Sequence, residues 1–205
     1  AAAPAKKKIG AVITVYRHNS HADVILTKIL EGWRHDGGPG PNLELAALYV
    51  DQFPDGDMAR DMAKKHGFKI VDRIEDAVTL GGSKIAVDGV LSIAEHGTYP
   101  FNELGQHLYP RRRFLDGILS AFRKTGGVVP VFNDKHLGPE WGDALAMYEQ
   151  TQELSVPFMA GSSVPVSFRK PDLDLPVGTP LDAAVGVGYG GFEAYGFHTL
   201  EMFQV

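Results

Sequence analysis

Short apolar runs alternate with longer amphipathic segments along the first 160 residues of the chain. The runs are almost continuously apolar, which is typical of strands that are buried on both faces of a parallel sheet. Strands are expected at 9–15, 43–50, 69–71, 87–94, 128–132 and 156–160. Helices are expected at 22–33, 57–66, 74–80, 111–124 and 139–154. The alternation predicts an α/β fold, a doubly wound, Rossmann-like parallel sheet with helices on both faces.

Polar loops follow the predicted strands. Right-handed crossovers place every strand-to-helix loop of such a sheet at the carboxyl edge, where ligands bind in this fold class. The loops expected at that edge are 16–21, 51–55, 95–99 and 133–138. Candidate functional residues are therefore sought in these four segments.

Composition excludes several classes of function. The 205-residue chain has 20 Lys and Arg against 25 Asp and Glu, a net charge of −5, which argues against a nucleic-acid-binding surface. The absence of cysteine excludes disulfides, thiolate metal sites and cysteine nucleophiles. No apolar run approaches the roughly 18 residues of a membrane span. The start, Ala1–Lys8, is similar to the remnant of a cleaved export signal and equally to a flexible tail, so a periplasmic and a cytoplasmic location both stay open.

The character of the chain changes after Gly161. Four prolines punctuate the next twenty residues, at positions 165, 171, 176 and 180. A strand is expected at 181–187, and a helix is expected to start at Thr199 after a Gly-rich turn. About 45 residues are too few for an independent core. We therefore expect a tail at 1–8, a Rossmann-like domain at 9–160, and over 161–205 the beginning of a second α+β domain that a longer precursor or a partner chain completes.

Two short motifs hold side chains with catalytic chemistry. Lys135 lies in the segment Asn133–His136, directly after a predicted strand. Its ammonium group can hold a substrate hydroxyl and stabilise a developing alkoxide. His198 lies in the Gly-rich segment Gly190–Glu201, and its imidazole can accept a hydroxyl proton. The residues alone leave a packed histidine and a surface lysine as the plainer alternatives.

The order of elements, with the segments Val131–His136 and Val156–Ala160, resembles the glucose–fructose oxidoreductase / inositol dehydrogenase (Gfo/Idh/MocA) family. The fifth strand of that family ends in Glu-Lys-Pro, whose Lys assists catalysis, and Lys135 takes that place. The resemblance covers most of residues 6–205. It implies an NAD(P) cofactor, a sugar or polyol substrate, and self-association through the second domain.

The second motif of this family is Asp-x-Gly-x-His-x-x-Asp. It matches the segment Ala194–Glu201, where Ala194 stands in place of the first Asp with Glu193 beside it. His198 falls on the catalytic His of the family. The resemblance therefore implies that Lys135 and His198 are the catalytic residues.

The expected cofactor turn departs from the family pattern. That pattern has Gly-x-Gly-x-x-Gly or Gly-x-Gly-x-x-Ala, because a Cβ would keep the pyrophosphate away from the helix N-terminus. Here the turn Thr14–His21 has no glycine. A dinucleotide in the usual pose would meet Tyr16, Arg17 and His18, and Asp51 suits a ribose 2′-hydroxyl. The other candidates for cofactor contact at this edge are Glu95, His96 and Asp134.

Histidines at the carboxyl edge raise a metal site as an alternative, because imidazole binds zinc, manganese and iron. The candidates are His18, His21, His96 and His136. They form no recognised ligand pattern, and histidines that cap helices or bond loops explain them as well, so no metal is predicted. Aromatic residues could stack on a sugar ring, and the candidates are Tyr16, Tyr99, Tyr109, Trp141 and Tyr189. For Trp141 we expect a position in the core instead.

Three hypotheses follow. The leading one is an NAD(P)-dependent oxidoreductase acting on a sugar or polyol hydroxyl. The missing glycines and the His-rich edge favour a second hypothesis, a non-redox lyase, hydrolase or isomerase on the same frame, with or without assistance from a metal. The third is a non-catalytic binding or assembly subunit that has lost the cofactor site, with Ala194 in place of Asp as one motivation. In each case we expect a small-molecule or subunit partner, with self-association or a partner chain completing the second domain.

Overall fold

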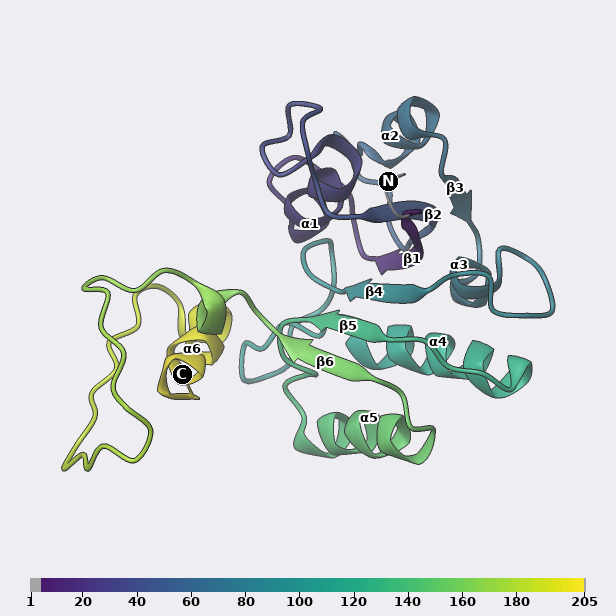
Figure 1. Cartoon of the computed structure of the whole chain (residues 1–205). Coiled ribbons are helices and arrows are strands. Elements are labelled where there is room, and N and C mark those ends of the chain that lie inside the picture. The colour runs from purple at the N-terminus through teal and green to yellow at the C-terminus, as the bar shows by residue number, and fades with distance from the viewer. Residues whose placement is uncertain (1–4, 205) are drawn as a thin grey trace.

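A six-stranded, all-parallel sheet in the order β3-β2-β1-β4-β5-β6 forms the centre of the molecule (Figure 1). The computed structural model describes residues 5–204. The strands are β1 (Lys7–Ile13), β2 (Leu43–Val50), β3 (Lys69–Val71), β4 (Gly89–Ile93), β5 (Val131–Asp134) and β6 (Phe158–Gly161). This strand order confirms the predicted Rossmann-like fold. It also places the point where the order reverses, the usual ligand crevice, between β1 and β4.

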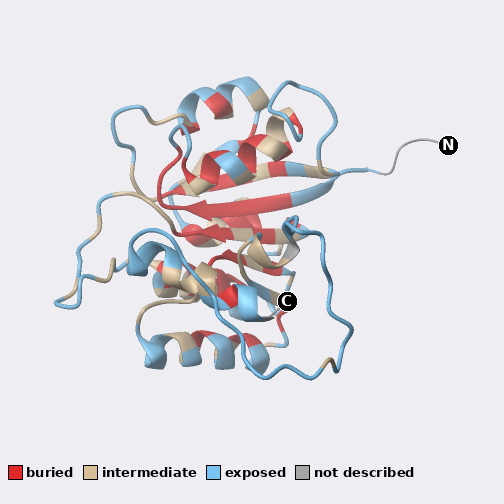
Figure 2. Ribbon diagram, turned by 90° about the vertical axis from the view of Figure 1, so that its left-hand side faces the viewer, coloured by how far each residue is buried: buried red, intermediate tan, exposed pale blue. Residues whose placement is uncertain are grey.

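Helices cover the sheet on both faces. These helices are α1 (His21–Glu31), α2 (Ala59–His66), α3 (Ile74–Thr79), α4 (Arg111–Thr125) and α5 (Trp141–Glu153). Helix α6 (Phe192–Glu201) and the 3₁₀ turns η1 (Val164–Val166) and η2 (Met202–Gln204) lie beyond the sheet. One core cluster packs α1 and α2 on the sheet, and a second packs α3, α4 and α5 on the opposite face. Because side chains alternate along a strand, Val12 joins one cluster while Ala11 and Ile13 join the other. Figure 2 shows this burial along the strands.

Close backbone packing fixes the register between layers at Gly10. A Cβ on Gly10 would lie 1.9 Å from the carbonyl oxygen of Ala77 in α3. The pairing of β1 with β2 also shifts register between Ile9 and Gly10. Only glycine allows the central strand and α3 to approach this closely.

Three sequence expectations are wrong in detail. No strand forms at 181–187, where the residues are exposed and pair with no described strand. Apolar residues alone do not make a strand when no sheet edge is available to pair with them. Helix α6 begins at Phe192 and not at Thr199, after Gly191 in extended conformation. Trp141, expected in the core, is 78% exposed at the first turn of α5.

The segments beyond the sheet bring α6 back to its carboxyl edge. Residues 167–191 make a long excursion, and α6 then lies beside the ends of β5 and β6 (Figure 1). The expected tail at 1–8 is described only from Ala5 onward, and Lys7 and Lys8 already belong to β1. No helix in the described part of the chain is long and apolar enough to cross a membrane.

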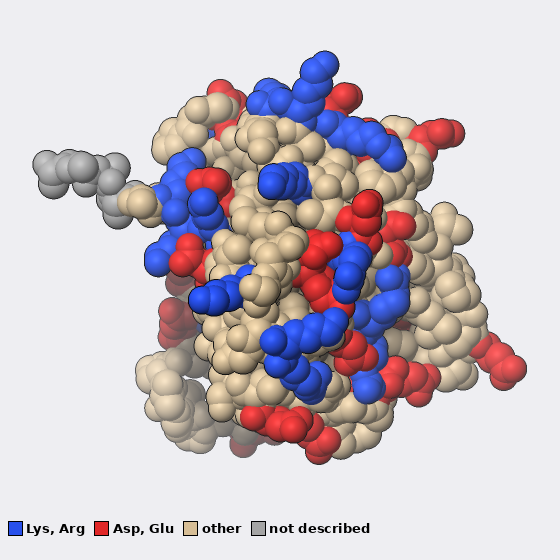
Figure 3. All heavy atoms as spheres, turned by 90° about the vertical axis from the view of Figure 1, so that its right-hand side faces the viewer, with Lys and Arg blue, Asp and Glu red and all other residues tan. Residues whose placement is uncertain are grey.

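Surface charge is mixed in sign on the face shown in Figure 3, where lysines and arginines lie beside aspartates and glutamates. Exposed ion pairs join α4 to its neighbours, including Lys124 Nζ with Glu75 Oε1 at 3.0 Å and Arg112 Nη1 with Asp143 Oδ1 at 2.9 Å. Such pairs contribute little to stability because water screens them. This face provides no broad basic field of the kind that attracts nucleic acid.

Candidate active site at the carboxyl ends of β4 and β5

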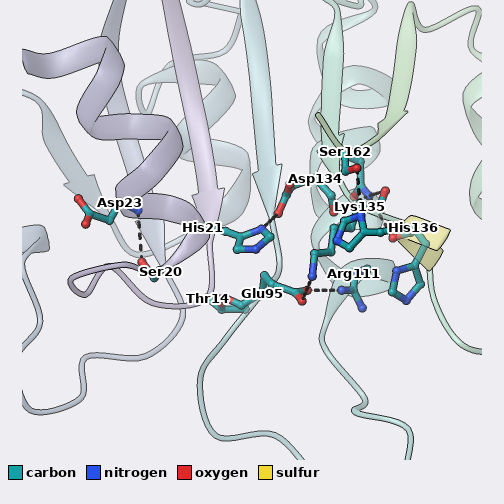
Figure 4. A network of polar contacts seen from close by, with 12 residues as sticks. Thr14, Ser20, His21, Asp23, Glu95, Arg111, Asp134, Lys135, His136 and Ser162 are labelled. Atoms are coloured by element: carbon teal, nitrogen blue, oxygen red, sulfur yellow. Dashed lines mark hydrogen bonds and ion pairs between the residues drawn. The ribbon is translucent and has the colours of Figure 1, made fainter. Parts of the chain in front are cut away.

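Buried charges gather where β4 and β5 end (Figure 4). Lys135 Nζ donates to Glu95 Oε1 at 2.8 Å, and Arg111 Nη2 donates to Glu95 Oε2. The side chains of Lys135, Glu95 and Arg111 are 10%, 11% and 3% exposed. Burial acts to raise the pKa of Glu95, but the charge of Arg111 and the hydrogen bond and charge of Lys135 outweigh it and hold that pKa below its usual value. Two cations thus share one ionised carboxylate.

Two residues of this site have left-handed backbone conformation without being glycine. His96 has φ of +68° and Lys135 has φ of +66°, each just beyond the end of its strand. The backbone N–H of Lys135 donates to the carbonyl oxygen of Gly161 at 2.9 Å, which helps to hold this turn. Such conformations cost of order 1–3 kcal/mol and concentrate at functional sites. They aim the side chains of two adjacent strand ends toward the edge.

A histidine and a carboxylate meet across the same edge. His21, the first residue of α1, lies with its Nδ1 2.5 Å from Asp134 Oδ2, and the Asp134 side chain is 7% exposed. The His21 ring also makes an edge contact with His96, with centroids 5.3 Å apart. The helix start that carries His21 is set by Ser20, whose Oγ accepts from the backbone N–H of Asp23 at 3.2 Å.

Several buried polar atoms at this edge have no hydrogen-bond partner among the described residues. They are His96 Nε2, Arg111 Nε, Asn133 Oδ1 and His136 Nδ1. Buried polar atoms are nearly always paired, so such a cluster marks a place where a ligand or water completes the bonding. Burial, followed by the charge of Arg111, lowers the pKa of His136 to about 4, so its ring is neutral at pH 7.

Two cavities open beside these residues. One of about 280 Å³ is lined by Glu95, Arg111, Lys135 and His136 together with the loop residues His107 and Tyr109. A second of about 630 Å³ shares Lys135 and His136 and extends between α5 and α6 along Trp141, Phe192 and Phe197. A charged end and an apolar, aromatic wall suit a small polar molecule with an apolar face.

His198 lies at the same edge of the sheet, next to the end of β6. Its Nδ1 lies 3.1 Å from Ser162 Oγ, just after β6, and 3.2 Å from Glu201 Oε2 in α6. His198 lines neither of the two cavities, but the adjacent Phe197 ring packs on His136 with centroids 5.2 Å apart. The structure therefore brings His198 to the same edge as Lys135 without a direct contact between the two.

The turn before α1 is closed by its own side chains. Tyr16 is fully buried, and its hydroxyl lies 2.8 Å from Thr27 Oγ1, so burial raises its pKa. The backbone N–H of Asn19 donates to Asp23 Oδ2 at 2.9 Å. Asp23 thus places a carboxylate where this fold class receives a phosphate. Of the predicted contact residues here, only Arg17 and His18 are exposed.

Asp51 is also engaged. Its Oδ2 accepts from Tyr99 at 2.6 Å and from Arg113 at 2.6 Å, and its Oδ1 accepts from Tyr49 at 2.8 Å. The loop after β4 is further tied down where Gln52 exchanges two hydrogen bonds with the backbone of Thr98. The oxygens expected to meet a ribose are thus occupied by Tyr99 of this loop, Arg113 of α4 and Tyr49 of β2.

Several solved structures are similar to this chain. A Gfo/Idh/MocA family oxidoreductase from Vibrio cholerae matches with a TM-score of 0.50 and 18% identity, over 78% of this chain and 40% of that one. An NAD binding oxidoreductase from Klebsiella pneumoniae (TM-score 0.47, 18% identity, 80% and 36% covered) and apo scyllo-inositol dehydrogenase from Lactobacillus casei (0.47, 15%, 80% and 39%) also match. No protein-family model and no curated protein matches the sequence.

The chain has the fold of a Gfo/Idh/MocA family oxidoreductase. It spans about 40% of the length of the Vibrio cholerae protein. At 18% identity this likeness concerns the fold and leaves the chemistry to the residues of this chain.

The metal candidates do not form a ligand set among the described residues. In the described range 5–204, no three His, Asp or Glu side chains gather so as to hold a metal ion. His21 and His96 are in ring contact, His136 lies by the cavities, and His18 is at the surface with a side chain 83% exposed.

The sequence analysis missed Arg111 as a site residue. Arg111 is buried on Glu95, and Arg113 binds Asp51. The available signal was position, because the run starts the helix that follows an edge loop. Ser162, which also contacts His198, had no comparable signal because it lies 36 residues away in the sequence. Glu201 lies only three residues after His198, at the last Asp of the family motif.

Proposed function

We propose that this chain is the Rossmann-type part of an oxidoreductase that acts on a hydroxyl group of a sugar- or polyol-like substrate. The observation that carries the proposal is Lys135. It is a buried ammonium at the ligand edge, in a left-handed turn, bonded to Glu95 and lining both cavities. A hydroxyl bound against Lys135 gains a hydrogen-bond donor where negative charge develops on oxygen.

The neighbouring residues have complementary roles in this proposal. Glu95 orients Lys135 and is itself held by Arg111, while the neutral ring of His136 offers a polar contact to the substrate. His198, held through Nδ1 by Glu201, is the proposed proton acceptor from the α6 side. The aromatic wall at Trp141 and Phe192 would contact the C–H face of a sugar ring.

A nicotinamide dinucleotide supplies the hydride acceptor in oxidoreductases of this fold class. The described residues do not fit it in the usual pose, because Asp23 holds an N–H at the start of α1 and three donors occupy Asp51. The negative charge of Asp23 would also repel a pyrophosphate. A dinucleotide would therefore have to bind this chain in a different pose.

Nucleotide binding and turnover test the proposal together. Purified protein is titrated with NAD⁺ and NADP⁺ by calorimetry, and reduction of the nucleotide is followed with myo-inositol and glucose as substrates. We expect substrate-dependent reduction that Lys135→Met lowers by at least about 100-fold. Absence of both nucleotide binding and reduction overturns the redox assignment.

A second candidate is a non-redox enzyme that isomerises or dehydrates a similar substrate. The closed turn at Asp23 and the saturated Asp51 favour it, because such a reaction needs the Lys135 site but no dinucleotide. Incubation of the same polyols and sugars without nucleotide, followed by proton NMR, tests this candidate. New sugar products that disappear in Lys135→Met would support it over the first.

A further inference from the structure

His21 and Asp134 form a dyad that the proposed roles above leave unused. Asp134 Oδ2 lies 2.5 Å from His21 Nδ1, and the Asp134 side chain is 7% exposed against 32% for His21. An ionised carboxylate can only accept a hydrogen bond, so the proton between the two groups belongs to Nδ1. A singly protonated ring with its proton on Nδ1 has its lone pair on Nε2.

The second ring nitrogen of His21 is available. His21 Nε2 makes no hydrogen bond with any residue from 5 to 204, and it is not one of the buried polar atoms without a partner. The Nε2 of His96, in the ring that contacts His21, is buried. Of these two rings at the crevice between β1 and β4, His21 is the one that can meet a ligand from solvent.

The dyad closes a ring of contacts with Lys135. His21 contacts Asp134 and His96, Glu95 precedes His96, and Lys135 binds Glu95 and follows Asp134. Asp134 of β5 bonds His21, and the charge of His21 acts on Glu95 and His96 beyond the end of β4. Lys135 follows Asp134, and the other charged or titratable groups on the turn and helix that carry His21 are Arg17, His18 and Asp23. A hydroxyl held by Lys135 on the α1 side would therefore lie beside an oriented imidazole.

We infer that His21 is a catalytic proton-transfer residue of the Lys135 site and that Asp134 is its positioning residue. The inference rests on the proposed function and makes His21, in place of His198, the acceptor of the proton from a hydroxyl held on the α1 side of Lys135. In the step, the substrate O–H bond breaks, its proton bonds to the lone pair of His21 Nε2, and the electron pair stays on oxygen as an alkoxide beside Lys135. The resulting imidazolium is stabilised by Asp134. The step moves only a proton, so it serves either candidate reaction.

The tautomer of His21 can be measured without any substrate. Imidazole ¹⁵N NMR of the full chain, with the His21 signals assigned by their absence in His21→Asn, should show protonated Nδ1 and unprotonated Nε2 at pH 7.5. Asp134→Asn should remove that preference, because its amide oxygen and nitrogen bind either tautomer. An Nε2-protonated His21 in the wild type overturns the inference whether or not activity is found.

Activity gives the second arm, with myo-inositol and NAD⁺ or NADP⁺ as the probes. His21→Asn should lower kcat by at least about 100-fold with a smaller change in KM. Asp134→Asn should lower kcat and change the pH profile, and added imidazole should partly restore His21→Ala. His35→Asn is the matched control, because His35 is exposed and asparagine tolerates its φ of +57°.

The outcomes separate the two levels of the proposal. An active wild type whose kcat His21→Asn leaves unchanged overturns the role of His21 and leaves the proposed function standing. A wild type inactive on every polyol and sugar tried, with and without nucleotide, overturns the proposed function. In that case the NMR result still decides whether His21 is held as the proton-accepting tautomer.

Discussion

Lys135 Nζ donates a hydrogen bond of 2.8 Å to Glu95 Oε1, and both side chains are about nine-tenths buried. Glu95 lies two residues beyond the end of β4, and Lys135 lies one residue beyond the end of the neighbouring strand β5. Burying charged groups is costly unless each has a partner. Arg111 adds a second cation to the same carboxylate. The cluster thus carries a net positive charge next to a cavity, which favours substrates or intermediates with negative charge on oxygen.

Lys135→Met should affect both stability and activity. Methionine fills a similar volume, but it leaves Glu95 with Arg111 alone, so we expect a loss on the order of 2 kcal/mol in the free energy of unfolding. Urea denaturation measures this loss. Lys124→Met is the control, because Lys124 pairs with Glu75 at the surface and should change stability by less than about 0.5 kcal/mol. Equal losses in the two variants would contradict the buried cluster.

Glu95→Gln should change how stability depends on pH. Arg111 and Lys135 outweigh burial and hold the pKa of Glu95 below its ordinary 4.5 in the folded chain. A lowered carboxylate pKa stabilises the fold above the unfolded value and loses that contribution as pH falls through the folded value. The wild type should therefore lose stability more steeply than Glu95→Gln below about pH 4.5. Urea midpoints between pH 3 and 7 compare the two, and parallel curves would count against the prediction.

The fold was predictable because its signals are local. Almost continuously apolar runs such as Ile9–Val15 and Leu43–Val50 are typical of strands in the interior of a parallel sheet, and the sheet then determines which loops share an edge. Placing Glu95, Asp134 and Lys135 at one edge needed nothing more than this topology. Apolar composition gave the wrong result at 181–187, because a strand requires a paired edge as well as apolar residues.

The details of the site depend on contacts between distant segments, and these were not predictable. Nothing local to Arg111 indicates that it turns inward, because its partner Glu95 comes from a different element. The engagement of Asp51 depends on Tyr99 and Arg113, which lie 48 and 62 residues away. Trp141 is a large aromatic residue of the kind expected in a core, yet its position at the start of α5 leaves it exposed.

Asp51→Asn should loosen the loop after β4. The substitution removes the charge that holds Arg113 and weakens the bond from Tyr99, so we expect a loss of about 1–2 kcal/mol in the free energy of unfolding. Limited proteolysis should cut the segment 97–109 faster than in the wild type. Asp55→Asn, an exposed aspartate in the following turn, serves as the matched control. A change in NAD⁺ affinity without a change in stability would mean that Asp51 serves a ribose and not the loop.

Gly10→Ala tests the packing that fixes the central strand. The added Cβ would lie 1.9 Å from the carbonyl oxygen of Ala77, so β1 and α3 must separate, and we expect a loss of about 3 kcal/mol in the free energy of unfolding. Gly142→Ala provides the opposite case, because Gly142 lies within α5 with open space around its Cα. Alanine is the better helix former, so this variant should gain about 0.5–1 kcal/mol.

Urea denaturation of the two glycine variants gives their free energies of unfolding on one scale. Because β1 carries the turn to His21 and pairs with β4, which leads to Glu95, separating β1 from α3 should also disturb the Lys135 site. Gly10→Ala should therefore lower activity as well as stability, whereas Gly142→Ala should leave activity unchanged. A Gly10→Ala protein as stable as the wild type would show that β1 and α3 are not in the close contact described.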